Sequence, residues 1–202
     1  VDRWSGATLL NDAGTLAQVI RESPAVWLIT DRFRLATRYD EPFLRTVIEQ
    51  FDIAFEERGV LALRADGWRG EPPLVVDAAL PAPLAAGPLT LTRWAHSAPV
   101  AGEDMAVTLT WQANAPIDRQ INTSFRLVDA AGNVIAQQDG PPARGILPTN
   151  LFFGTPLPDS KPLALPADLS PGEYQLQVVA YDVETVTPVG EPLVVGSVTV
   201  GL

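Results

Sequence analysis

The sequence predicts an α+β chain in two parts: a small α/β unit over residues 1–68, then an antiparallel β-sandwich over residues 89–202. In the first part, apolar residues recur at helical spacing in two stretches that alternate with short β-rich runs. In the second part, short alternating stretches are separated by turns, with no helical pattern between them. Residues 69–88 are rich in proline and glycine and are expected to form a connection across the surface.

Two helices are expected in the first part. The first spans residues 11–22, with Asn11 or Asp12 as its cap and Pro24 beyond its end. The second spans residues 41–50, behind Asp40 and with proline in its first turn.

Three strands complete the predicted α/β unit. Residues 25–30 read AVWLIT, an apolar run of strand length, which predicts a strand covered on both faces. Residues 51–55 and 60–64 flank Glu56-Glu57-Arg58-Gly59, where the glycine can supply the left-handed conformation of a hairpin turn.

The second part shows strand patterns with one apolar face each. In one of them Val107, Leu109 and Trp111 alternate with polar residues and are expected to point inward. Residues 129–133 read DAAGN and predict a turn. The expected strands span residues 105–112, 121–128, 134–137, 163–165, 174–181 and 193–200.

The stretch SPGEYQLQVVAYD, residues 170–182, identifies the kind of sandwich. Pro171 and Gly172 predict a tight turn, and Tyr174 opens the strand that follows. A tyrosine at this place can return its hydroxyl to the backbone, as in the tyrosine corner of immunoglobulin-like domains. We therefore expect an immunoglobulin-like β-sandwich.

Composition excludes several classes of function. Hydrophobic residues make up 47% of the 202 residues, yet no apolar run reaches the roughly 18 residues of a membrane helix. The chain is therefore expected to be globular and soluble as given. Fourteen basic residues face 24 acidic ones, which disfavours binding to nucleic acid or to anionic lipid. Cysteine is absent, so disulfides, thiolate nucleophiles and cysteine-bound zinc are excluded. The chain opens at Val1, and we expect it to be a piece of a longer protein.

No catalytic residue is predicted. His96 is the only histidine, and beside Trp94 at a strand end it is expected to be a partly exposed side chain. Asp31 directly follows an apolar strand, where an α/β enzyme can place a functional acid; a turn, cap or ion-pair role is preferred. Nucleotide and nucleophile motifs are missing from the sequence.

Acidic pairs at residues 56–57, 103–104 and 182–184 are interpreted as solvated carboxylates. Asp182 and Glu184 could instead contribute to a calcium site, but the spacing of a calcium loop is missing. No metal or cofactor is predicted.

Three aromatic residues in expected loops are the candidate ligand-binding residues: Trp68, Phe152 and Phe153. An aromatic face in a loop can stack on a sugar or on a protein partner, although a buried anchor is the commoner use. Trp27 and Trp111 lie in patterns typical of a core.

Two stretches resemble a known family. The first contains SPAVWLITDRFRLATRY and FDIAFEERGVLAL, within residues 23–63, and the second contains VTLTWQA, INTSFRLVDAAGNVIAQQDGPP, GILPTN and LSPGEYQLQVVAYD, within residues 105–182. Together they are similar to the soluble C-terminal regions of multi-spanning bacterial glycosyltransferase-like membrane proteins. The family is the dolichyl-phosphate-mannose mannosyltransferase type, as found in Chloroflexi-like bacteria.

The resemblance implies a non-catalytic extracytoplasmic accessory region. The catalytic acids of such enzymes lie in the membrane portion, which this chain lacks, so no catalytic residue carries over. The expected partners are the membrane portion of the parent chain and a glycan acceptor, and the expected roles are acceptor binding or bracing of the membrane enzyme. A protein-interaction module of the cell envelope is the alternative, and an independent hydrolase is a third reading. Where related sandwiches have Trp after the Pro-Thr motif, this chain has Leu151-Phe152-Phe153.

Overall fold

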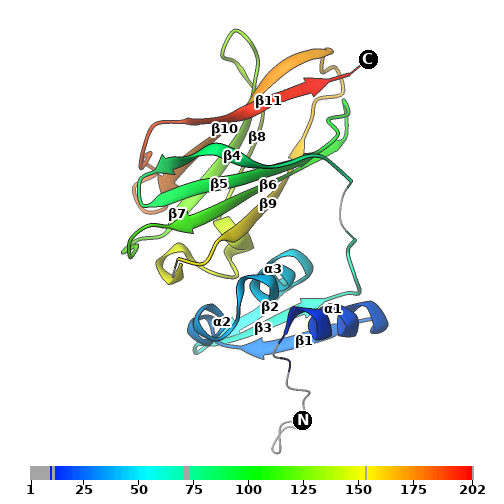
Figure 1. Cartoon of the computed structure of the whole chain (residues 1–202), viewed down its shortest axis with the longest axis vertical. Helices are drawn as coiled ribbons and strands as arrows, with labels where there is room; N and C mark the ends of the chain where they lie inside the picture. Colours follow the sequence, from blue (N-terminus) through cyan, green and yellow to red (C-terminus); the bar gives the residue numbers. More distant parts are fainter. Residues whose placement is uncertain (1–9, 11, 71–72, 153, 202) are drawn as a thin grey trace, which may run out of the picture. The chain divides into compact units, whose positions relative to one another are not determined.

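The computed structural model describes residues 10, 12–70, 73–152 and 154–201. The chain divides into two compact units, Val1–Gly70 and Glu71–Leu202 (Figure 1). As predicted, the first combines helices with a sheet and the second is an antiparallel β-sandwich.

Each helix of the first unit begins behind an aspartate. The helices are α1 (Ala13–Glu22), α2 (Arg32–Arg38) and α3 (Glu41–Gln50). The carboxylates of Asp12, Asp31 and Asp40 accept the backbone N–H three residues on, at 2.8, 2.7 and 3.1 Å. These bonds satisfy donors that the first helical turn leaves without partners. The predicted helix at 41–50 is confirmed, and the one predicted at 11–22 is confirmed from Ala13 onward with Asp12 as its cap, whereas Asn11 lies outside the described residues. Helix α2 was not predicted, but the cap role preferred for Asp31 is confirmed.

The sheet of the first unit is antiparallel, with strand order β1-β3-β2. Its strands are β1 (Val26–Thr30), β2 (Asp52–Glu57) and β3 (Val60–Ala65). Arg58 and Gly59 connect β2 to β3, and their φ angles of 50° and 82° match the two-residue turn that suits a twisted hairpin. The hairpin prediction is confirmed, with Gly59 in the left-handed conformation.

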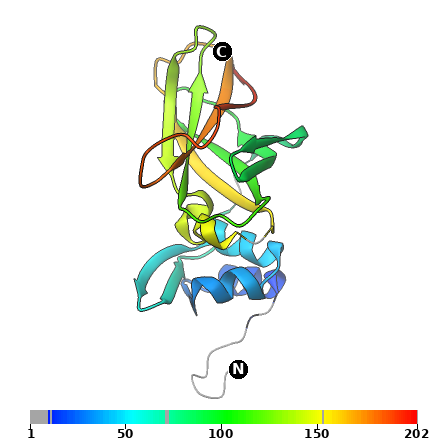
Figure 2. The same cartoon turned by 90° about the vertical axis from the view of Figure 1, so that its left-hand side faces the viewer.

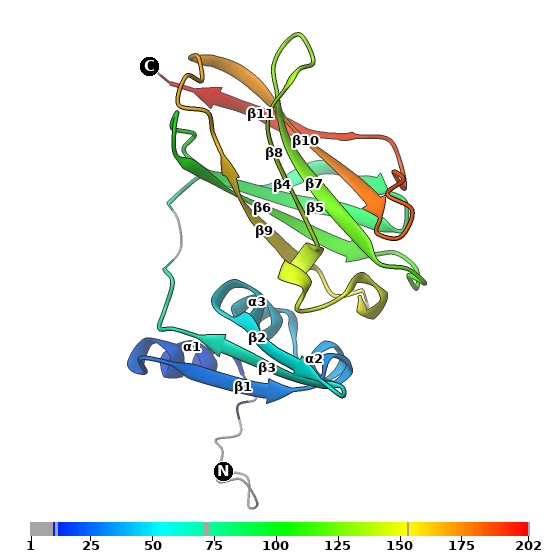
Figure 3. The ribbon, with the colours of Figure 1, turned by 180° about the vertical axis from the view of Figure 1, so that it is seen from behind.

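The three helices cover one face of this sheet (Figures 1 and 3). Four apolar side chains of α3 are buried: Phe43, Leu44, Val47 and Ile48. The fully buried side chains of this core are Leu16, Ile20, Leu35, Phe43, Leu44, Val47, Ile48, Phe51, Leu61 and Leu63.

Strand β1 is not covered on both faces, so that prediction is wrong. Val26 is 9% exposed, whereas Trp27 and Ile29 are 54% and 62% exposed. Successive side chains of a strand point to opposite faces, and the helices pack on only one of them. The prediction of Trp27 as a core residue fails for the same reason.

The second unit consists of two four-stranded antiparallel sheets packed face to face (Figures 1 and 2). One sheet has the order β4-β5-β6-β9 and comprises β4 (Leu74–Ala86), β5 (Leu89–Ser97), β6 (Asp104–Ala113) and β9 (Leu157–Ala164). The other has the order β11-β10-β7-β8 and comprises β7 (Ile121–Val128), β8 (Val134–Gly140), β10 (Gly172–Asp182) and β11 (Leu193–Val200). Two short 3₁₀ helices, η1 (Pro142–Gly145) and η2 (Thr149–Leu151), lie between β8 and β9.

The predicted connection over residues 69–88 is wrong for residues 74–86, which form strand β4. This strand lies at the edge of its sheet and pairs only with β5 among the described strands. Proline is tolerated on an edge, because a missing N–H there breaks no central ladder. Pro81 and Pro83 fall in the gap where the register jumps between Ala79 and Leu84.

The predicted tyrosine corner is confirmed. The Tyr174 hydroxyl donates to the backbone carbonyl of Ser170 at 2.8 Å, at the entrance to β10. Alternation in β6 is also as predicted, since Val107, Leu109 and Trp111 are at most 1% exposed. Both features agree with the predicted immunoglobulin-like sandwich, and the core lies between the two sheets.

One close contact ties the two sheets of the sandwich together. Trp94 of β5 packs on Gly196 of β11, where a Cβ added to the glycine would lie 2.5 Å from Cζ2 of the indole. Glycine is required because the Cβ of any other residue would overlap with the indole ring of Trp94.

We predict that Gly196→Ala lowers the free energy of unfolding by about 1–3 kcal/mol, the usual cost of overpacking. Urea denaturation of the full chain measures this. Gly201→Ala is the matched control, because open space surrounds that position. Equal stability of the two variants would contradict the contact.

Candidate functional site

The uncovered face of the β1-β3-β2 sheet is the candidate functional site. Four large apolar side chains lie on it, and we call them the outer sheet face: Trp27, Ile29, Phe55 and Val60. Their exposed fractions are 54%, 62%, 52% and 45%. Figure 3 shows this unit from the side opposite to Figure 1, with the strands in front of the helices.

Strand register explains why these side chains share a face. Trp27 pairs with Arg64, and Ile29 pairs with Ala62. Phe55 of β2 pairs with the same Ala62 from the other side, next to a bulge in β2. Because directly paired residues of neighbouring strands point to one side, the apolar groups of all three strands gather there.

The polar groups around the outer sheet face are paired with one another. Arg64 lies over the ring of Trp27, with its guanidinium carbon 5.5 Å from the ring centroid, and pairs with Asp66 at 2.6 Å. Asp52 pairs with Arg69. At the hairpin, Glu57 and Arg58 approach to 3.6 Å. The rim therefore carries both signs of charge in balance and offers no field that would select an ionic ligand.

A face of this kind can bind another surface by burying apolar area. An exposed group of large apolar side chains with a polar rim is typical of an interaction site. Aromatic residues and arginine are also enriched in protein interfaces. In the structure, Trp27 and Ile29 alternate with less exposed neighbours. In the sequence, every residue from 25 to 29 is apolar, so the pattern does not show which side of the strand is exposed.

Two of the predicted ligand residues, Phe152 and Trp68, lie in different units of the chain. Phe152 is 4% exposed and belongs to the core of the second unit. Trp68 belongs to the first unit and is half-buried, with the guanidinium carbon of Arg21 4.0 Å above its ring. Phe153 lies outside the described residues. Ligand binding by these residues stays a prediction.

His96 differs from its prediction. We expected a partly exposed side chain, but it is 3% exposed in the sandwich core. Its Nδ1 lies 2.7 Å from the carbonyl of Ser97, and its Nε2 is buried without a hydrogen-bond partner among the described residues. Strand β5 carries it inward, and its ring centroid lies 5.2 Å from that of Trp94.

One of the acidic residues has a partner on a neighbouring helix. Glu56 pairs with Arg32 of α2 at 2.6 Å, and the hydrogen bond from that arginine lowers the pKa of Glu56. Within the described part of the chain, no group of three His, Cys, Asp or Glu side chains could hold a metal ion.

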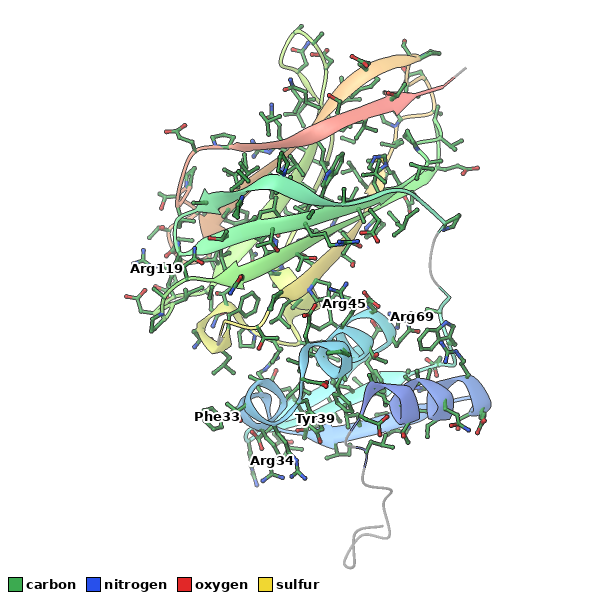
Figure 4. The ribbon with its side chains drawn as sticks, viewed as in Figure 1. Phe33, Arg34, Tyr39, Arg45, Arg69 and Arg119 are labelled. Carbon is green, nitrogen blue, oxygen red and sulfur yellow. The ribbon has the colours of Figure 1, made fainter. Side chains whose placement is uncertain are left out.

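A second surface feature is the loop between β10 and β11. Asp182 Oδ1 accepts the backbone N–H groups of Glu184 and Thr185 at 2.9 and 3.0 Å. Val186 follows with φ of 55°, a conformation that β-branched residues rarely adopt, and it is 71% exposed. Arg119 lies on the neighbouring β6–β7 loop (Figure 4) and approaches Asp182 at 3.8 Å. Together the loops border a shallow depression lined by Pro88, Pro116, Ile117, Asp118, Arg119, Thr187, Pro188 and Val189.

We predict that the loop depends on the charge of Asp182. Hydrogen bonds from the Thr185 and Glu184 backbone lower the pKa of this carboxylate below its ordinary 3.8. Its stabilising effect is therefore present above about pH 4 and lost as the pH falls through the lowered pKa. The amide proton shifts of residues 184 and 185 in an NMR titration report this loss. They should stop titrating in Asp182→Asn, and an unchanged titration in that variant would contradict the assignment.

No known family model matches the chain, and a search of curated proteins found no similar sequence. Among the described residues, no helix has the length and apolar character needed to cross a membrane.

We predict that Ile29→Thr changes the free energy of unfolding by no more than about 0.5 kcal/mol, because the side chain contributes little to the core. Leu63→Ala is the control from the covered face, where Leu63 is fully buried, and it should cost about 2–5 kcal/mol. Chemical denaturation distinguishes the two. A large loss in Ile29→Thr would show that the outer sheet face is covered within the chain.

Proposed function

We propose that the chain is a non-catalytic extracytoplasmic accessory region of a membrane glycosyltransferase-like protein. In this proposal the small unit braces the parent by docking its outer sheet face on the membrane portion of the same protein. The parent protein is inferred from the family resemblance of residues 23–63 and 105–182. The outer sheet face is the surface that would attach to it.

The exposure of Trp27, Ile29, Phe55 and Val60 is the observation that carries the proposal. Two aromatic and two aliphatic side chains, each about half exposed, lie on one small sheet. Leaving such groups in water costs free energy that a partner surface would recover, at roughly 25 cal/mol per Å² of buried apolar area. Docking on the membrane portion would bury these side chains and remove this cost.

The rim indicates the chemistry of the occupant. Its charged groups already neutralise one another, through the pairs of Arg64 with Asp66 and of Arg69 with Asp52. An anionic lipid surface or a strongly charged protein would gain little from such a rim. We therefore assign an apolar, uncharged protein surface as the partner of the outer sheet face. In this proposal that surface belongs to the membrane portion of the parent protein.

Acceptor binding by a glycan is the less supported role. A sugar site stacks an open aromatic ring beside polar groups, and here Phe152 is buried and Trp68 already carries Arg21 on its ring. The envelope interaction module is the nearer rival, since it would use the same outer sheet face with a different partner.

The proposal predicts a specific cross-link in the full-length parent protein. With a photoreactive benzoylphenylalanine at position 29, illumination in native membranes should join this chain to the membrane portion of the same protein. The matched control places the same group at Val194 of β11, which is 51% exposed and belongs to the second unit. It should give no such product.

Each other product contradicts bracing. Cross-links from position 29 to a different protein would support the interaction module instead. Cross-links to lipid alone would show that the outer sheet face meets the bilayer. Products that are identical at positions 29 and 194 would mean that neither surface is specific.

A further inference from the structure

Strand β1 forms an open edge of the sheet in the small unit. It pairs with β3 and with no other described strand (Figure 3). In the described part of the chain, residues 26–30 make no backbone–backbone hydrogen bond outside this pairing. A free row of backbone N–H and C=O groups is a template to which another strand can be added.

The other edge strands of the described sheets carry features that oppose the addition of a strand. Strand β2 has a register shift between Ile53 and Phe55 and ends in two glutamates. The pairings of β8 with β7 and of β11 with β10 also contain register shifts. Strands β4 and β9 each contain two prolines, and β9 directs Lys161 inward to an ion pair with Asp159 at 2.6 Å. Bulges, prolines and inward charges are the usual protection of a sheet edge.

Strand β1 has none of these protective features. Its sequence, VWLIT, contains no proline, glycine or charged residue. All five of its residues pair with β3 without a register shift. Five residues is an ordinary strand length, so the edge is not protected by being short. Among the edges of the described sheets, β1 is therefore the one best suited to accept a strand.

We propose that β1 pairs with β1 of a second copy of this chain, so that the small unit forms a symmetric dimer. The two strands run antiparallel, with Leu28 of each copy at the two-fold axis. This is the register in which all five residues of both strands have partners. It places Trp27 opposite Ile29 of the second copy, and Ile29 opposite Trp27 of the second copy.

A second copy is the favoured partner because β1 complements itself. The axis at Leu28 makes each contact occur twice, as in the isologous interfaces of most protein dimers. An aromatic residue opposite a β-branched one is a favourable cross-strand pair, and β1 brings no charge that would repel its own copy. The dimer also closes on itself, because the other edge of the sheet is the bulged and charged strand β2. The pairing should therefore stop at two copies.

The dimer would join the sheets of two small units in the order β2-β3-β1-β1-β3-β2. Directly paired residues point to one side, so the outer sheet faces of both copies would lie on the same side of the joined sheet. The strands meet through backbone groups at their edges, so Trp27, Ile29 and Phe55 stay on the open face. This inference therefore does not depend on the proposed function.

Sedimentation equilibrium of the purified full chain over a range of concentrations tests the proposal. The wild type should pass reversibly from the mass of one chain to the mass of two. Trp27→Lys combined with Ile29→Lys places lysine opposite lysine twice, which should weaken the dimer by about tenfold or more. Trp27→Glu combined with Ile29→Lys is the matched variant. It removes the same two apolar side chains but places glutamate opposite lysine twice, so it should retain the dimer.

Four results would overturn the proposal. A wild type that stays monomeric at millimolar concentration has no such pairing, and species larger than a dimer would mean open-ended association. A dimer that persists in the Lys/Lys variant would use another surface. Loss of the dimer in the Glu/Lys variant would mean that the apolar faces meet rather than the strand edges. Urea denaturation checks that both variants are folded. If the Lys/Lys variant is not, the wild type and the Glu/Lys variant still decide the question.

Discussion

Packing of three helices against one side of a three-stranded sheet is the constraint on which the small unit depends. The helices bury one apolar layer, and their aspartate caps fix where each begins. Nothing in the described residues of this unit forms a second helical layer. The other side of the sheet therefore keeps Trp27, Ile29 and Phe55 at the surface, and the functional proposal follows from that asymmetry.

In the sandwich, each sheet covers the inner face of the other. Its core contains Trp111 and Phe125, fully buried, together with the polar cluster around Asp159. Polar groups in such a core need partners, and Thr123 and Trp111 provide them. The two units differ in what covers the sheet: a second sheet in the sandwich, and helices in the small unit.

Local signals in the sequence predicted the elements well. Capping aspartates, Gly59 in its hairpin and the Pro-Gly turn before Tyr174 act within a few residues, so the sequence alone reveals them. Burial depends on neighbours that are distant in sequence. The run from Ala25 to Ile29 is apolar on both sides, and only the position of the helices shows which side is exposed.

The same limit explains the other errors. Proline suggested a connection at residues 81–83, but an edge strand has a free side that accepts it. His96 was expected to be partly exposed because it stands beside Trp94 at a strand end, whereas the tertiary packing buries it. The Asp159 cluster gave no signal, because its four side chains come from three strands that lie far apart in the sequence.

Solvent access to Trp27 tests the central claim most directly. Hydroxyl-radical footprinting would compare oxidation of this indole in the isolated chain and in the membrane-embedded parent. Docking of the outer sheet face predicts ready oxidation in the isolated chain and strong protection in the parent. Equal oxidation of Trp27 in both would contradict the account.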